Sequence, residues 1–127
     1  MKIAALIARI LMGLTFLVFG LNGFFHFIPS GPMPTGPAGE FIDAIVKSHF
    51  FMMVAVVQIV GGVLLLVNRF VPLALVILGP VIVNIFFFHL LMLPSGLPQA
   101  IVVVILWTIV AIREKQYLAG IFVQRAE

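Results

Sequence analysis

The chain has 127 residues, of which 64% are hydrophobic and only 9% are charged, and its mean hydropathy is +1.33. Soluble domains usually carry about 25% charged residues, so this composition excludes an ordinary soluble domain and indicates an integral membrane protein. The chain has no cysteine, which excludes a disulfide framework, a thiolate metal site and an iron–sulfur cluster. Its Lys and Arg residues are too few and scattered for a nucleic-acid-binding surface, despite a net charge of +3.

Four apolar runs predict the fold. A membrane-spanning helix needs about 20 mostly apolar residues. We expect spans at residues 3–28, 50–67, 71–93 and 97–112 of a single domain, residues 1–127. The short connections predict antiparallel neighbours, so the fold class is an all-α, up-down-up-down four-helix bundle. Glycines in the first two spans favour close helix packing.

Residues 29–49 form the longest connection. Its first part, residues 29–39, holds four prolines and three glycines, which excludes regular helix or strand. A short helix is then expected, with Pro37 near its start, and the apolar stripe of Phe41, Ile42, Ile45 and Val46 predicts that it is amphipathic and lies on the outer membrane surface. Such a helix either covers the bundle as a lid or is a plain connector.

Two charged segments outside the spans have simple interpretations. Glu40, Asp43 and His49 are close in sequence, which is compatible with a proton entry, a divalent-metal site or ordinary solvation; no metal site is predicted. Residues 113–127 are predicted to be a cytoplasmic tail with an interfacial helix, because Tyr117 and Phe122 share an apolar face beside basic residues.

The distribution of positive charge orients the bundle. The predicted topology leaves Lys47 alone on one side of the membrane. The other side holds six cations: Lys2, Arg9, Arg69, Arg113, Lys115 and Arg125. Under the positive-inside rule, both termini are expected in the cytoplasm, and the protein is expected to be a multi-pass inner-membrane protein.

Five polar side chains interrupt the apolar runs: Asn22, His26, Gln58, Asn84 and His89. Hydrocarbon offers no water to such groups, so they tend to face protein or a cavity and to mark function. In the predicted topology all five lie between the midplane and the outer surface. They are therefore the candidate ligand-binding residues of a polar pocket in the outer half of the bundle.

Geometry limits which of these residues can meet. Asn22 and His26 are four residues apart and share a helix face. Asn84 and His89 are five apart, which places them on different faces of a straight helix. A break at Pro80, which lacks the amide that would bond the carbonyl of Val76, can change that.

Three stretches, GLTFLVFGLNGFFHFIP, GGVLLLVNRFVPLAL and PVIVNIFFFHL, resemble the DoxX family of small four-span bacterial membrane proteins. The family is named after proteins associated with terminal quinol oxidase and with thiosulfate:quinone oxidoreductase. The resemblance implies a bacterial inner-membrane protein linked to respiratory or oxidative-stress redox chemistry, and it implies no catalytic mechanism. The residues that match the family pattern are Asn22, Gly23, His26, Gly61, Gly62, Asn68, Arg69, Pro72, Asn84 and His89.

Four functions are compatible with these residues. The first is an accessory or structural subunit of a membrane redox complex, or a homo-oligomer, in which the five polar groups cross-link helices. The second is a quinone site, whose carbonyls bond the polar groups and whose ring packs among phenylalanines. Those phenylalanines are Phe24, Phe25, Phe86, Phe87 and Phe88.

The other two functions place stricter demands on the geometry. A b-type haem needs His26 and His89 as axial ligands at one depth. A small-solute or proton pathway needs a polar track through the inner half, where the sequence offers only Thr15, Asn68 and two arginines. In all four cases the expected surroundings are membrane lipid, with no nucleic-acid partner. Whether the chain is an enzyme is left open by its sequence.

Overall fold

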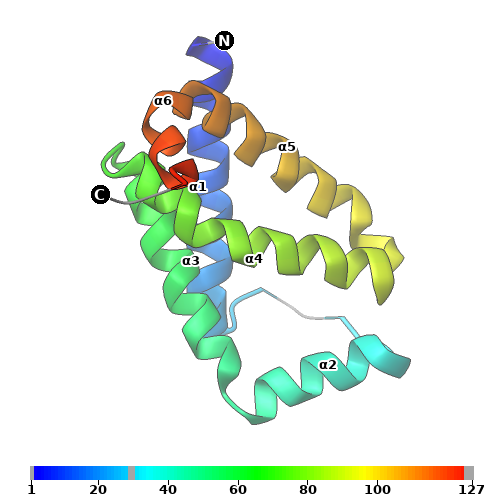
Figure 1. Cartoon of the computed structure of the whole chain (residues 1–127). Helices are drawn as coiled ribbons and strands as arrows, with labels where there is room; N and C mark the ends of the chain where they lie inside the picture. The colour runs from blue at the N-terminus through cyan, green and yellow to red at the C-terminus, as the bar shows by residue number, and fades with distance from the viewer. Residues whose placement is uncertain (1, 29–30, 125–127) are drawn as a thin grey trace.

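In the computed structural model, which describes residues 2–28 and 31–124, every regular element is a helix (Figure 1). The all-α class predicted from the sequence is confirmed. In chain order, the elements are α1 (Lys2–Phe25), α2 (Gly36–Lys47), α3 (Phe50–Leu66), α4 (Val71–Leu91), η1 (Pro94–Gly96), α5 (Leu97–Arg113), α6 (Lys115–Leu118) and η2 (Ala119–Phe122).

Four of these helices form an antiparallel bundle, as predicted. Helix α1 packs against α3 and α5, α3 packs against α4, and α4 packs against α5. Helices α1 and α4 and the segment Pro94–Arg113 are each long and apolar enough to cross a membrane. Helix α3 has only 17 residues and passes that test together with α2, from which it is bent by 85°. The described chain therefore has three candidate spans, or four if the bent pair is one.

Glycines bring α1 and α3 into backbone contact. A Cβ atom on Gly62 would lie 2.7 Å from the backbone nitrogen of Leu17 and 2.8 Å from the carbonyl oxygen of Gly13. On the other side of α3, a Cβ atom on Gly61 would lie 2.6 Å from Leu78 of α4. The adjacent glycines thus let α3 approach a helix on each side, the use expected of small residues in membrane helices.

Most helix bounds lie within two residues of the predicted spans, and the end of α1 and the start of the last span differ by three. Helix α1 ends at Phe25 rather than near residue 28, because His26 takes a left-handed conformation (φ 51°) and its N–H bonds the carbonyl of Asn22 at 2.8 Å. The last span begins earlier than residue 97, because η1 leads directly into α5. Pro94 and Pro98 each fall in a first turn, where the missing N–H of proline costs little.

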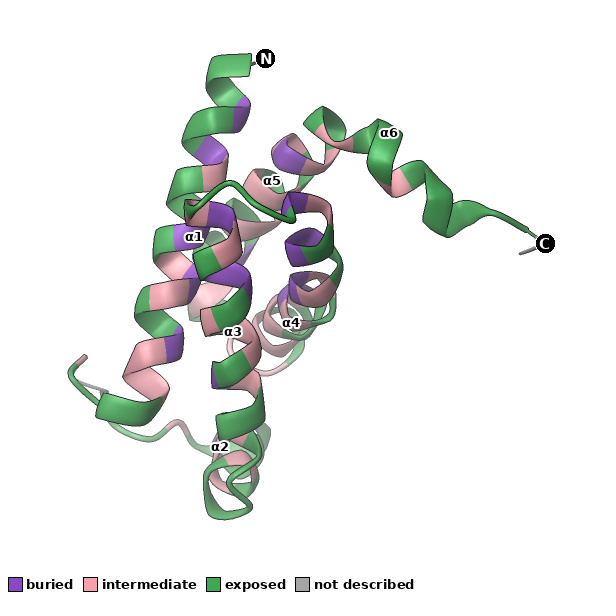
Figure 2. Cartoon of the chain, turned by 90° about the vertical axis from the view of Figure 1, so that its left-hand side faces the viewer, coloured by how far each residue is buried: buried purple, intermediate pink, exposed green. Residues whose placement is uncertain are grey.

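The buried core occupies the half of the bundle that contains the N-terminus of α1. Its members come from the first two thirds of α1, the ends of α3 and α5, and the first half of α4 (Figure 2). They are Ala8, Met12, Phe16, Leu65, Val71, Ala74, Leu75, Leu78, Ile82 and Val110. Among the described residues this core contains no buried polar side chain, so it closes that half of the bundle.

Two side chains hydrogen-bond across helices in the packed half. The guanidinium of Arg9 donates to the carbonyl of Leu65 in the last turn of α3, where the helix dipole favours a cation. The indole of Trp107 donates to the carbonyl of Leu75 at 3.0 Å and so links α5 to α4. Both bonds tie helices together at backbone carbonyls rather than through pairs of side chains.

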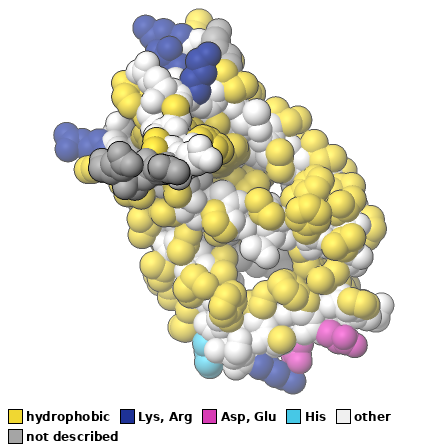
Figure 3. All heavy atoms as spheres, viewed as in Figure 1, with side chains coloured by type: hydrophobic (Ala, Val, Ile, Leu, Met, Phe, Trp, Pro, Cys, Tyr) yellow, Lys and Arg dark blue, Asp and Glu magenta, His cyan; other side chains and the backbone are white. Residues whose placement is uncertain are grey.

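Charged side chains lie at the two ends of the molecule, with an apolar surface between them (Figure 3). One end holds the start of α1, the α3–α4 turn and the end of α5, with Lys2, Arg69 and Arg113. The other end holds α2, on which Asp43 and Lys47 form an exposed ion pair at 3.0 Å. The predictions for Pro29, Ser30 and residues 125–127, including Arg125, concern residues outside those that the structure describes.

Candidate functional site

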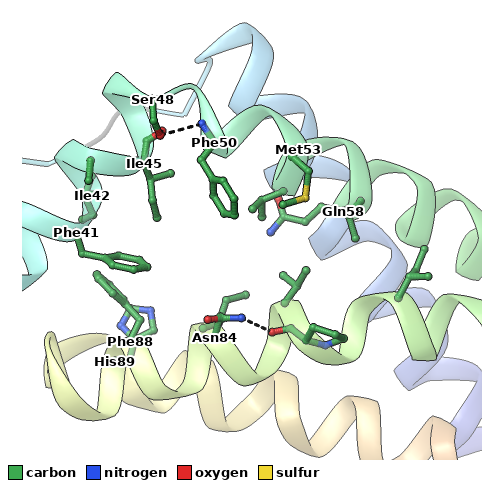
Figure 4. A pocket seen from close by; sticks show the side chains of 17 residues that line it. Phe41, Ile42, Ile45, Ser48, Phe50, Met53, Gln58, Asn84, Phe88 and His89 are labelled. Atoms are coloured by element: carbon green, nitrogen blue, oxygen red, sulfur yellow. Dashed lines mark hydrogen bonds between the residues drawn. The ribbon is translucent and has the colours of Figure 1, made fainter.

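A cavity of about 690 Å³ lies between α2, α3 and α4, in the half of the bundle away from the core (Figure 4). Ligand pockets in proteins typically measure about 300–1,000 Å³, so the space is large enough for a small organic molecule. Its lining is mostly apolar and consists of Phe41, Ile42, Ala44, Ile45, Ser48, Phe50, Met53, Val54, Val57, Gln58, Ile77, Pro80, Val81, Asn84, Ile85, Phe88 and His89.

Helical periodicity explains two walls of the cavity. The α3 wall runs from Phe50 to Gln58 at spacings of three and four residues, which is one face of a helix. The α4 wall runs from Ile77 to His89 and covers about half of the helix circumference, at 100° per residue. Asn84 and His89 lie toward opposite flanks of this wide face. Both side chains therefore reach the same cavity. If the cavity met only a narrow strip of α4, one of the two residues would lie outside it.

Helix α2 forms the third wall because the chain turns sharply before α3. His49 takes a left-handed conformation (φ 63°), and the hydroxyl of Ser48 donates to the carbonyl of Ile45 and accepts from the amide of Phe50, both at 3.3 Å. On α2, the ring of Phe41 lies 5.4 Å from that of Phe88 on α4, centroid to centroid. Helix α2 thus bridges α3 and α4, which is the position that a lid requires.

Three of the five sequence-predicted site residues line the cavity. The side-chain amide nitrogen of Asn84 donates to the carbonyl of Pro80 at 2.8 Å. The Nδ1 atom of His89 lies 3.2 Å from the carbonyl oxygen of Leu93. No described residue is hydrogen-bonded to the side-chain amide of Gln58. The cavity therefore combines apolar walls with these three polar side chains. The amide of Gln58 has no partner among the described residues, and Asn84 and His89 each have a second polar atom that can bond a ligand.

The remaining two residues do not belong to this cavity. The side-chain oxygen of Asn22 accepts from the backbone N–H of Ile28 at 2.7 Å, and the backbone of His26 closes the last turn of α1. The imidazole of His26 is exposed, with its nearest aromatic neighbour Phe51 at 6.4 Å between centroids. No residue of α1 lines the cavity. The structure thus separates the five candidates into two groups. Asn22 and His26 cap the end of α1, and the other three line the cavity.

The aromatic walls also differ from the expected set. Of the five predicted phenylalanines, only Phe88 lines the cavity. Phe86 and Phe87 instead line a second hollow of about 330 Å³ against α5. Phe41 and Phe50 supply the missing aromatic surface, and sequence reasoning did not select them. Phe41 does lie in the apolar stripe that predicts α2, but the stripe does not indicate which part of the bundle that apolar face packs against.

Three of the sequence-based hypotheses find no support in this geometry. The histidines do not fit a haem, because His89 lines the cavity and His26 does not. The side chains of Asn22, Asn84 and His89 make only local hydrogen bonds among the described residues, rather than the cross-links between helices that a purely structural role needs. A polar pathway would have to pass the apolar core.

Acidic residues and histidines do not gather into a metal site in the part of the chain that the structure describes. No group of three or more His, Asp or Glu side chains is placed to hold a metal ion. Asp43 is paired with Lys47 at 3.0 Å, as expected for residues four apart on an exposed helix. The segment around Glu40 and His49 is therefore the solvated end of the molecule.

These helices define a multi-pass, all-helical membrane protein with a cavity of about 690 Å³ between α2, α3 and α4. The sequence model of the DoxX family matches residues 4–90, well over half of the chain. The chain belongs to the DoxX family. Every residue that lines the cavity falls within the matched segment, whereas α5 lies outside it. No curated protein and no solved structure matches the chain.

Proposed function

We propose that this DoxX protein is an accessory protein of a membrane redox system and that its cavity holds a quinone-type ligand. The observation that carries the proposal is one cavity with mainly apolar walls and four polar residues, Ser48, Gln58, Asn84 and His89. A quinone needs that combination, because its ring and tail require apolar surface and its two oxygens require hydrogen-bond partners.

The chain's own residues supply distinct parts of such a site. Phe41, Phe50 and Phe88 offer ring surface, and Gln58 on α3 faces the polar residues of α4 across the cavity (Figure 4). A bound quinone supplies two-electron chemistry. His89 lines the cavity, and its imidazole is suited to exchange a proton with a ligand oxygen by general acid–base chemistry.

The proposed accessory role means that another protein subunit takes part in the redox chemistry of this site. Quinone chemistry needs a second redox group, and the chain has no cysteine from which to make one by thiol chemistry. We place that group on another subunit of a membrane redox complex. The redox link implied by the family resemblance supports this choice, and assembly with further copies of the chain is the alternative arrangement.

We further propose that the protein resides in a bacterial inner membrane with both termini in the cytoplasm. The support is the positive charge at the end that contains Lys2, Arg69 and Arg113. The cavity then opens in the outer half of the membrane, where a lipid-soluble ligand is available.

Ligand extraction tests the cavity assignment. We expect the protein purified in lipid nanodiscs to carry quinone above the level in empty nanodiscs, and Gln58→Leu to lose most of it. Thr108→Val is the matched control, since Thr108 is exposed on α5 and lies outside this cavity. Quinone at the empty-nanodisc level, or a Soret band that shifts on reduction, would contradict the proposal.

A further inference from the structure

The carbonyl of Pro80 fixes the orientation of the Asn84 side chain. A carbonyl oxygen only accepts hydrogen bonds, so the Asn84 atom at 2.8 Å from it is the amide nitrogen. The side-chain oxygen then points away from Pro80, toward the end of α4 that carries Phe88 and His89 (Figure 4). Because Asn84 is exposed and lines the cavity, this oxygen is an acceptor available to a ligand.

The carbonyl of Leu93 fixes His89 in the same way. The Nδ1 atom, 3.2 Å from that oxygen, carries the proton of the neutral imidazole, so Nε2 carries the lone pair. Gly96 holds the ring in place, because a Cβ atom there would overlap its Cε1 and Nδ1 atoms. The second polar group of α4 is therefore also an acceptor with a fixed direction.

Two fixed acceptors on one wall distinguish the redox forms of a ligand. A quinone presents only carbonyl oxygens, which cannot bond Asn84 Oδ1 or His89 Nε2, whereas a quinol presents two hydroxyl donors. The amide of Gln58 has both a donor and an acceptor and serves either form. We propose that the cavity binds the reduced, hydroxyl-bearing form of its ligand in preference to the oxidised dicarbonyl form, an inference that rests on the proposed function.

The size of the preference follows from the two hydrogen bonds. One net hydrogen bond between neutral groups changes a binding constant by about two- to tenfold. The side-chain amide of Asn84 keeps a second N–H that can donate to a quinone carbonyl, so the preference rests mainly on the His89 acceptor and reaches up to about tenfold. Tenfold tighter binding of the reduced form raises the midpoint potential of a bound two-electron couple by about 30 mV.

Three probes of the same shape test this preference on the unmodified full chain. They are a decyl-substituted benzoquinol, its quinone and its dimethyl ether, and their partition is measured into nanodiscs with and without the protein. We expect the quinol to bind up to about tenfold more tightly than the other two, because the ether keeps the shape but lacks the donors. Equal binding of all three would overturn the preference and leave the cavity assignment intact. Binding of none above empty nanodiscs would overturn the proposed function as well.

Variants assign the preference to its two acceptors. His89→Leu should lower quinol affinity toward that of the quinone and leave quinone affinity within about twofold, and Asn84→Leu should lower the preference less. Gly96→Ala should weaken the preference by displacing the imidazole, and Thr108→Val should retain it. An unchanged preference in both Asn84→Leu and His89→Leu would overturn the role of these acceptors.

Discussion

At the scale of single residues, Asn22 and His26 show that a polar group in an apolar run can serve the backbone. A helix that ends inside or near a membrane leaves carbonyl and N–H groups without partners. Asn22 provides both its carbonyl, for the N–H of His26, and its side-chain oxygen, for the N–H of Ile28. The pair therefore terminates α1, and its spacing of four residues follows from that geometry.

Substitution at His26 separates this capping role from ligand binding. His26→Gly should keep or slightly raise the thermal unfolding temperature in detergent, because glycine adopts a positive φ without steric cost. His26→Val should destabilise the protein by about 1 kcal/mol or more, because a β-branched side chain is more crowded than histidine in a left-handed conformation. Quinone content should be unchanged in His26→Gly. Loss of ligand from His26→Gly with an intact fold would instead place the imidazole in a binding site.

The limits of sequence reasoning are clearest for these residues. Hydropathy and charge place Asn22, Gln58 and His89 at the correct end of the bundle, because depth depends only on position within a span. The direction of each side chain depends on what packs beside it. The wide cavity-facing side of α4 and the early end of α1 set those directions. Neither feature can be predicted from the type of one residue or from the spacing between the polar residues.

At the scale of helices, the α1–α3 pair is the most closely packed contact in the bundle. Gly13 and Gly62 face one another, so the two backbones meet without intervening side chains. Arg9 adds a bond from α1 to the last turn of α3. Together these contacts hold α3 against α1, and the wider space is left on its other side, between α3 and α4.

Alanine at two glycines tests this account. Gly62→Ala should destabilise the protein by about 1–3 kcal/mol, since its methyl group would meet the backbone of Leu17 and Gly13, which cannot rotate away. Gly79→Ala is the matched control within α4, where a Cβ meets nothing within 4 Å. It should be neutral or stabilise by up to about 1 kcal/mol, through helix propensity. Thermal unfolding in detergent measures both, and equal effects would refute close packing at Gly62.

The helices themselves were predictable, and the angle between two of them was not. Apolar runs and the position of Pro37 predict α2 and α3 as separate helices. The 85° bend comes from the left-handed backbone of His49, a residue without the signature that glycine gives such a turn. That bend carries Phe41 and Ile45 to the cavity, whereas the sequence left open whether this helix covers the bundle or is a plain connector.

At the scale of the whole molecule, the bundle has a packed half and an open half. The core from Met12 to Leu78 fills the end with most of the positive charge, and the cavity occupies the end covered by α2. Rigid packing and a ligand space are thus separated along the bundle. A substitution in the core is expected to change stability, and a substitution in the cavity is expected to change binding.

The number of membrane crossings follows from whether α3 spans. If α1, α4 and α5 alone cross, the two ends of the chain lie on opposite sides; if α3 also crosses, they lie on the same side. The structure places the start of α1 and the end of α5 at one end of the bundle (Figure 1). Under the proposed orientation, the positive charge at that end makes it the cytoplasmic end. We therefore expect four crossings, with α3 completing its short span through α2.

Reporter fusions measure this directly. A fluorescent protein that folds only in the cytoplasm should fluoresce when fused to either terminus. A phosphatase that folds only outside should be active when inserted within residues 31–35, between α1 and α2. Lys47→Glu should leave both results unchanged, because it removes the one cation on the outer side. Phosphatase activity at the C-terminus alone would mean an odd number of crossings, and then α2 and α3 would form a re-entrant pair that enters and leaves by one face.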